Sequence, residues 1–182
     1  MKIYVIAFLA GCVLTMILGK FVLAELRKLK AGQEIRQDGP TWHNSKAGTP
    51  TMGGLCFIFG ILVTLGLVWG MFHNQLPEVL GLPQMKAGMM VLFLAFGSGL
   101  IGFLDDFIKV IKHRNLGLTE AQKMILQIAL TFGFMFGLNS LGLLTTQVQL
   151  PIFGLVDMGL VYYPIAFFGI IFLVNAVNLT DG

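Results

Sequence analysis

The chain has 182 residues, of which 56% are hydrophobic and only 12% are charged. Its mean hydropathy is +0.84, and a soluble domain of this size needs a larger polar surface, so the composition excludes a soluble globular protein. The net charge of +3 could suit a nucleic acid. The basic residues are confined to gaps between apolar runs, however, so we expect no nucleic-acid partner.

Five runs reach or approach the roughly 20 apolar residues that a bilayer-spanning helix requires. They are residues 3–23, 55–72, 87–104, 124–141 and 160–177. Because backbone polar groups find no water inside a bilayer, each run is expected to be a helix. The sequence thus predicts an all-α, polytopic membrane bundle with five transmembrane helices. The connection 142–159 contains a short alternation of polar and apolar residues that is compatible with a β-hairpin.

Lysine and arginine are unevenly distributed between the connections, which predicts the orientation of the chain. Ten of these 12 residues lie in 20–46 and 109–123, and only Lys2 and Lys86 lie on the other side. Since cytoplasmic connections carry the excess of basic residues, we expect the N-terminus outside and both basic connections in the cytoplasm.

An acidic pair, Asp105–Asp106, directly follows the third apolar run. Ionised residues at membrane depth are costly and usually have a task or a partner. Neighbouring helical residues point about 100° apart, so the two carboxylates cannot do one identical job. One could hold a divalent ion while the other accepts a proton. The alternative is a helix-end ion pair with Lys109, which lies at i+4 and i+3.

A second polar motif, residues 46–54, precedes the second apolar run. Thr49 is suited to the N-cap and Pro50 to the first helical position, and a helix N-terminus beside Lys46 attracts phosphate. The alternative is a tightly turned helix start with Lys46 as an ordinary cytoplasmic charge.

A third motif ends the fifth run, where Asn175, Asn178 and Asp181 recur every third residue. On a continuing helix they occupy a sector of about 120°, which suits a polar ligand or a metal. The alternative is a helix end that frays into water.

The basic segment between the third and fourth runs offers further cations. Lys109 and Lys123 lie nearest the bilayer edge and are the better candidates to bind phosphate, whereas Lys112 and Arg114 are assigned to topology. Thr119 is expected to cap the fourth span. Acidic, cationic and amide groups at one membrane face are what phosphoryl transfer needs, and the membrane location suggests a lipid substrate.

These motifs together closely resemble the phospho-N-acetylmuramoyl-pentapeptide transferases, or translocase I, within the polyprenyl-phosphate N-acetylhexosamine-1-phosphate transferase superfamily. The resemblance runs from about residue 20 to the last residue. It is carried by the strings Lys46-x-Gly-Thr-Pro-Thr-Met-Gly-Gly54, Asp105-Asp-Phe-x-Lys-Val110 and Asn175-Ala-Val-Asn-Leu-Thr-Asp-Gly182.

The resemblance implies a magnesium-dependent enzyme of peptidoglycan synthesis, and so of cell-wall biogenesis, cell shape and cell division. Such an enzyme moves phospho-MurNAc-pentapeptide from its UDP carrier to undecaprenyl phosphate, giving lipid I and UMP. Members of the family have about ten helices, form homodimers and act at the cytoplasmic face of the bacterial inner membrane. The alternatives are a related transferase that uses UDP-GlcNAc, and a non-enzymatic transporter or scaffold fragment.

The same resemblance implies roles for single residues. Asp105 and Asp106 would be catalytic carboxylates. Substrate binding would fall to Lys46, Thr51, Lys109, Lys123, Asn175, Asn178 and Asp181. Family members continue through a further aspartate that binds the metal, so we expect the principal ligand beyond Gly182, with either carboxylate of the pair as an additional candidate. Residues 1–182 would then be the N-terminal part of one transferase domain, inactive alone.

Overall fold

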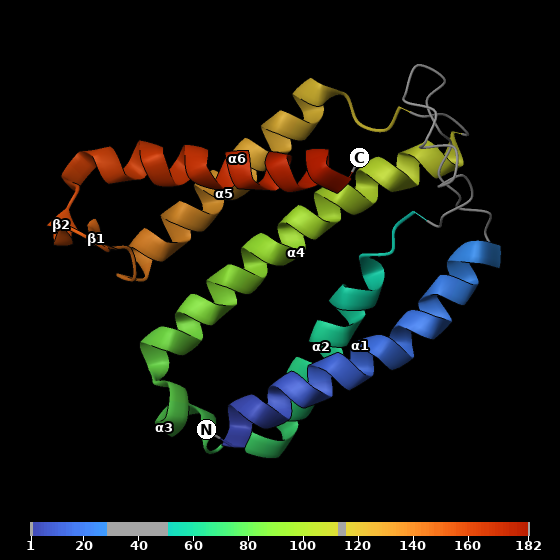
Figure 1. Cartoon of the computed structure of the whole chain (residues 1–182), viewed down its shortest axis with the longest axis horizontal. Coiled ribbons are helices and arrows are strands. Elements are labelled where there is room, and N and C mark those ends of the chain that lie inside the picture. Colours follow the sequence, from blue (N-terminus) through green and yellow to red (C-terminus); the bar gives the residue numbers. More distant parts are fainter. Residues whose placement is uncertain (1, 29–50, 113–115, 182) are drawn as a thin grey trace. The chain divides into compact units, whose positions relative to one another are not determined.

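The computed structural model describes residues 2–28, 51–112 and 116–181, the last three by their backbone only (Figure 1). Its elements, in chain order, are α1 (Lys2–Lys28), α2 (Leu55–Phe72), α3 (Leu76–Leu80), α4 (Leu82–Ile111), α5 (Glu120–Ser140), β1 (Gln147–Leu150), β2 (Gly154–Asp157), the 3₁₀ turn η2 (Gly159–Val161) and α6 (Tyr162–Asp181). Within the described ranges, five helices are long and apolar enough to cross a bilayer. The predicted multi-pass helical membrane fold is thereby confirmed.

The observed helices extend past several of the predicted spans. α4 continues to Ile111, seven residues beyond the apolar run, so that Asp105 and Asp106 lie within a helix. The ion pairs that both carboxylates make with Lys109 support this continuation. α1 likewise runs on to Lys28.

The short helix α3 is an element that the sequence does not predict. Its five residues are too few to show an apolar period. Gly81 ends it with a φ of 76°, a left-handed conformation that favours glycine, and α4 begins at the next residue.

The described helices divide into two compact units, one of residues 1–81 and 99–119 and the other of residues 82–98 and 120–182. In the first unit, α1 and α2 pack closely because small residues line their contact. A Cβ added at Gly60 would overlap the side chain of Thr15 and lie 3.2 Å from its Cα. In a bilayer, such close approach supplies the packing energy that hydrophobic burial does not.

In the second unit, α5 packs against the N-terminal part of α4 and against α6. Gly133 of α5 faces Phe93 of α4, so a glycine on one helix accommodates a large side chain on the other. The face of α5 turned inward also carries two buried polar residues, Gln127 and Thr131, spaced by one helical turn.

The connection between α5 and α6 contains an antiparallel hairpin in which Gln147 pairs with Asp157 and Leu150 pairs with Gly154. This confirms the hairpin predicted within residues 142–159. Asp157 accepts hydrogen bonds from the Thr146 hydroxyl and the Gly159 N–H. These bonds, the first above all, lower the pKa of the exposed Asp157 carboxyl.

Candidate functional site

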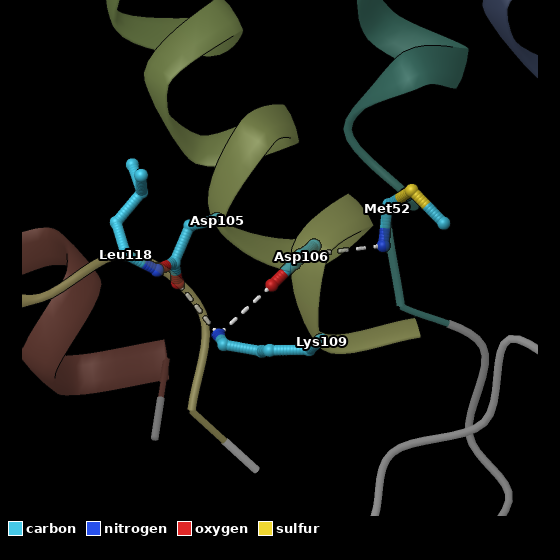
Figure 2. A network of polar contacts seen from close by, with 5 residues as sticks. All are labelled: Met52, Asp105, Asp106, Lys109 and Leu118. Atoms are coloured by element: carbon cyan, nitrogen blue, oxygen red, sulfur yellow. Dashed lines mark hydrogen bonds and ion pairs between the residues drawn. The ribbon is translucent and has the colours of Figure 1, made fainter. Parts of the chain in front are cut away.

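Asp105 lies on α4 with both of its carboxylate oxygens engaged (Figure 2). Oδ1 accepts a hydrogen bond of 2.9 Å from the backbone N–H of Leu118, and Oδ2 lies 2.6 Å from Nζ of Lys109. The side chain is only 8% exposed. A carboxylate so buried is held in one orientation by its partners, because leaving it unpaired would be costly.

Asp106, the next residue, faces other partners and is more accessible. Its Oδ1 lies 3.1 Å from Nζ of Lys109, and its Oδ2 accepts a long hydrogen bond of 3.4 Å from the backbone N–H of Met52. Its side chain is 31% exposed. The two carboxylates thus have different surroundings, as their angular separation on a helix requires.

Lys109 joins both carboxylates from one turn further along α4 (Figure 2). One ammonium beside two carboxylates leaves a formal net charge of about −1 in the cluster, which favours a cation or a proton over an anion. The ion pair that the sequence allowed as an alternative is therefore present. It does not exclude catalysis, because Asp106 keeps accessible surface.

The loop before α5 approaches Asp105 so closely that only glycine fits at position 117. A Cβ added there would overlap both the backbone carbonyl and the carboxylate of Asp105. The adjacent Leu118 supplies the N–H that binds Oδ1. Sequence reasoning missed both residues, because a backbone donor leaves no side-chain signal. Gly117, in the loop that follows the acidic pair, is the sequence signal that could have pointed to this contact.

The second motif meets the acidic pair through Met52, whose φ of 64° is unusual for a residue other than glycine. Gly54 is the N-cap of α2, so the start of this helix expected at Thr49 and Pro50 is wrong; both residues lie outside the described ones. The structure brings the start of α2 to the end of α4. Thr51 is half-buried next to Met52, and Lys46 lies outside the described residues.

Of the other predicted cations, Lys112 is exposed at the C-cap of α4 and Arg114 lies outside the described residues. Lys123 belongs to the second unit and is half-buried in the first turn of α5. This helix begins directly after Thr119, the residue expected to precede it.

The third motif belongs to α6, which remains helical through Asp181, as its three-residue spacing assumed. Asn175 is half-buried and is bonded to Gln127 of α5, a partner that sequence reasoning missed. The available signal was a lone amide inside an apolar run. Asn178 is exposed, and the side chain of Asp181 lies outside the described part.

No three His, Cys, Asp or Glu side chains gather closely enough to hold a metal within residues 2–28, 51–112 and 116–178. The acidic pair nevertheless offers the right donor chemistry for Mg²⁺. This ion commonly takes one or two carboxylates and completes its shell with water and substrate phosphates. Asp106 fits this role better than Asp105, because its side chain is 31% exposed against 8% and its contacts are longer.

Residues 88–182, a little over half of the chain, match the model of glycosyl transferase family 4. The chain belongs to this family. Residues 46–58 also match signature 1 of the phospho-N-acetylmuramoyl-pentapeptide transferases, which covers the segment that meets the acidic pair through Met52.

Several similar relatives are named phospho-N-acetylmuramoyl-pentapeptide-transferase. That of Desulfitobacterium hafniense is 43% identical over 182 residues, which are 100% of this chain and 51% of the relative. Those of Halalkalibacterium halodurans and Bacillus subtilis are 40% and 38% identical, again over 100% of this chain and 53% of each relative. The chain thus spans about half the length of the curated relatives it matches.

Proposed function

We propose that the protein containing this chain transfers phospho-MurNAc-pentapeptide from UDP-MurNAc-pentapeptide to undecaprenyl phosphate, forming lipid I and UMP. The observation that carries the proposal is the cluster of Asp105, Asp106 and Lys109 against the segment that matches the transferase signature. Carboxylates and a cation at the end of a membrane helix suit a reaction between a phosphorylated lipid and a nucleotide sugar.

The two carboxylates take different parts in this proposal. Asp106, with the more accessible oxygens, accepts the proton of the lipid phosphate or binds Mg²⁺. Asp105 holds Lys109 beside Asp106, and the resemblance to the transferases assigns this lysine to substrate binding. When bound, Mg²⁺ would neutralise charge on the diphosphate. The resemblance to the transferases adds further substrate-binding residues, namely Lys46, Thr51, Lys123, Asn175, Asn178 and Asp181.

We further propose that the protein is a homodimer of the bacterial inner membrane, with its N-terminus outside and its active site at the cytoplasmic face. The excess of basic residues in 20–46 and 109–123 supports this orientation. The contact of Met52 with Asp106 supports placing these two segments at one face, as the orientation requires.

The experiment measures UMP release by the full-length protein with undecaprenyl phosphate and Mg²⁺, supplying either UDP-MurNAc-pentapeptide or UDP-GlcNAc. We expect release with the first donor and none above background with the second. Release with UDP-GlcNAc alone would assign the protein to the related GlcNAc-1-phosphate transferases. No release with either donor, from folded protein, would refute both activities.

A further inference from the structure

Gln127 and Asn175 form a reciprocal amide pair between α5 and α6, outside the carboxylate–lysine cluster. Asn175 Nδ2 donates to Gln127 Oε1 at 2.8 Å and to the carbonyl of Ile171 at 2.8 Å. Gln127 Nε2 donates back to Asn175 Oδ1 at 3.4 Å. Gln127 is only 6% exposed. Both N–H groups of Asn175 are therefore used within the protein.

Such a pair matters because hydrophobicity alone does not fix the rotation of a helix about its axis in a membrane. Lipid tails are as apolar as leucine, so helix rotation depends on close packing and on hydrogen bonds between helices. α6 exposes large apolar side chains around most of its surface, including Phe168, Phe172 and Val177. The amide pair constrains the rotation of α6, which its exposed apolar side chains do not.

The pair also sets the level at which α5 and α6 meet. The two helices are consecutive, are in contact and run in opposite senses across one another (Figure 1). Lys123 precedes Gln127 by one turn on α5, and Asn178 follows Asn175 by almost one turn on α6. Both therefore lie on the same side of the pair, at about 6 and 4.5 Å along their helix axes.

Rotation of α6 would move Asn178 directly. Residues three apart on a helix differ in direction by about 60°, so the direction of Asn178 is set once Asn175 is held. The side chain of Asn178 is exposed, whereas that of Asn175 is half-buried and bonds to Gln127 of α5.

We propose that Gln127 is a positioning residue. By binding Asn175, it fixes the rotation of α6 about its axis and the position of α6 along α5, so that Asn178 and Lys123 face the same nucleoside diphosphate substrate. The inference rests on the proposed function, from which Lys123 and Asn178 take their roles. It differs from the resemblance in one respect: Asn175 acts through the helix rather than by touching substrate.

The test is a double-mutant cycle in the full-length protein with Gln127→Leu, Asn175→Leu and their combination. Steady-state kinetics with the nucleotide-sugar donor are measured for each. We expect each single change to raise KM or lower kcat at least about tenfold, since small misplacements of binding groups have effects of this size. The double variant should be no worse than the poorer single one. The exchange Gln127→Asn with Asn175→Gln should recover most of the activity, because it restores an amide pair.

Thr131→Val is the matched control, because Thr131 is buried on the same face of α5 one turn away. It should leave KM and kcat within about threefold of wild type, a range typical of a neutral change. Independent effects of the two leucine substitutions, or failure of the exchange, would overturn the inference and favour direct contact of Asn175 with substrate. A fall in thermal stability without a kinetic change would also overturn it.

A second readout does not depend on turnover. Nitroxide labels on Lys123→Cys and Asn178→Cys, in a background freed of other cysteines, report the distance between the two positions by electron paramagnetic resonance. We expect a narrow distribution that broadens with Gln127→Leu and not with Thr131→Val. An unchanged distribution would overturn the inference even if the protein were active. Broadening in the labelled protein, together with no UMP release by the unlabelled wild-type protein, would leave the amide pair standing and refute only the transferase proposal.

Discussion

The carboxylate of Asp105 lies 2.6 Å from the ammonium of Lys109, one turn further along α4. Asp105 is buried, and its other oxygen is bound by the N–H of Leu118. Asp106 shares the same lysine at a longer distance and is nearly four times as exposed. The pair therefore divides into a carboxylate fixed by the protein and one left accessible, and this asymmetry has measurable consequences.

The first consequence concerns stability. Asp105→Asn should destabilise the full-length protein by about 2 kcal/mol, because it removes the charge from a buried carboxylate whose two oxygens both have partners. Asp106→Asn should cost under about 1 kcal/mol, since its ion pair is partly exposed and its backbone hydrogen bond is long. Thermal unfolding in detergent measures both. An equal fall in Tm for the two variants would contradict the difference.

The second consequence concerns the loop that binds Asp105. Gly117→Ala places a Cβ into the space of the Asp105 carboxylate and carbonyl, so we expect a loss of about 1–3 kcal/mol and a fall in activity. Gly102→Ala is the control, because nothing lies within 4 Å of a Cβ added at that position on α4. It should be neutral or slightly stabilising. Comparable stability and activity of the two variants would show that the loop does not hold Asp105.

A third prediction, independent of the acidic pair, concerns the close approach of α1 and α2. Gly60→Ala forces a methyl group against Thr15, including its backbone, and should lower stability by about 1–3 kcal/mol. Gly66→Ala, on the same helix with open space at its Cβ, should not. Thermal unfolding of the two variants in detergent provides the comparison. If Gly60→Ala unfolds at the wild-type temperature, the two helices do not meet at this glycine.

A fourth prediction, also independent of the acidic pair, concerns the pH dependence of the hairpin formed by β1 and β2. Because the Thr146 hydroxyl lowers the pKa of Asp157, the stabilising effect of its ionised form is complete above the ordinary carboxyl pKa. It is lost as the pH falls through the lowered pKa. Thr146→Val should raise that pKa, measured by NMR of the carboxyl carbon. Thr145→Val should not, because Thr145 bonds to the N–H of Gln147 instead. Identical titration of Asp157 in wild type and Thr146→Val would contradict this.

The sequence predicted the membrane helices well because apolar length is a strong local signal. It placed the end of α4 too early, since the apolar run stops at Leu104 while the helix continues through Asp105 and Asp106 to Ile111. The pairing of both carboxylates with Lys109 could be read from their spacing, because it lies within one helix.

Contacts between separate segments could not be predicted in this way. The N–H groups of Met52 and Leu118 carry no side-chain pattern, yet they bind the two carboxylates. The partnership of Gln127 with Asn175 depends on how two helices cross, which neither helix encodes alone. The cap expected at Thr49 failed because the chain turns at Met52–Gly54 before α2 begins.

The central claim is that the accessible carboxylate of the pair takes part in phosphoryl transfer, and Asp106→Asn tests it most directly. The measurement is the rate of UMP release from UDP-MurNAc-pentapeptide by the full-length variant, with its Tm recorded in parallel. We predict a loss of at least about a thousandfold at nearly unchanged Tm, because proton transfer and metal binding both need the charge. A rate within about tenfold of wild type, from equally stable protein, would contradict the claim.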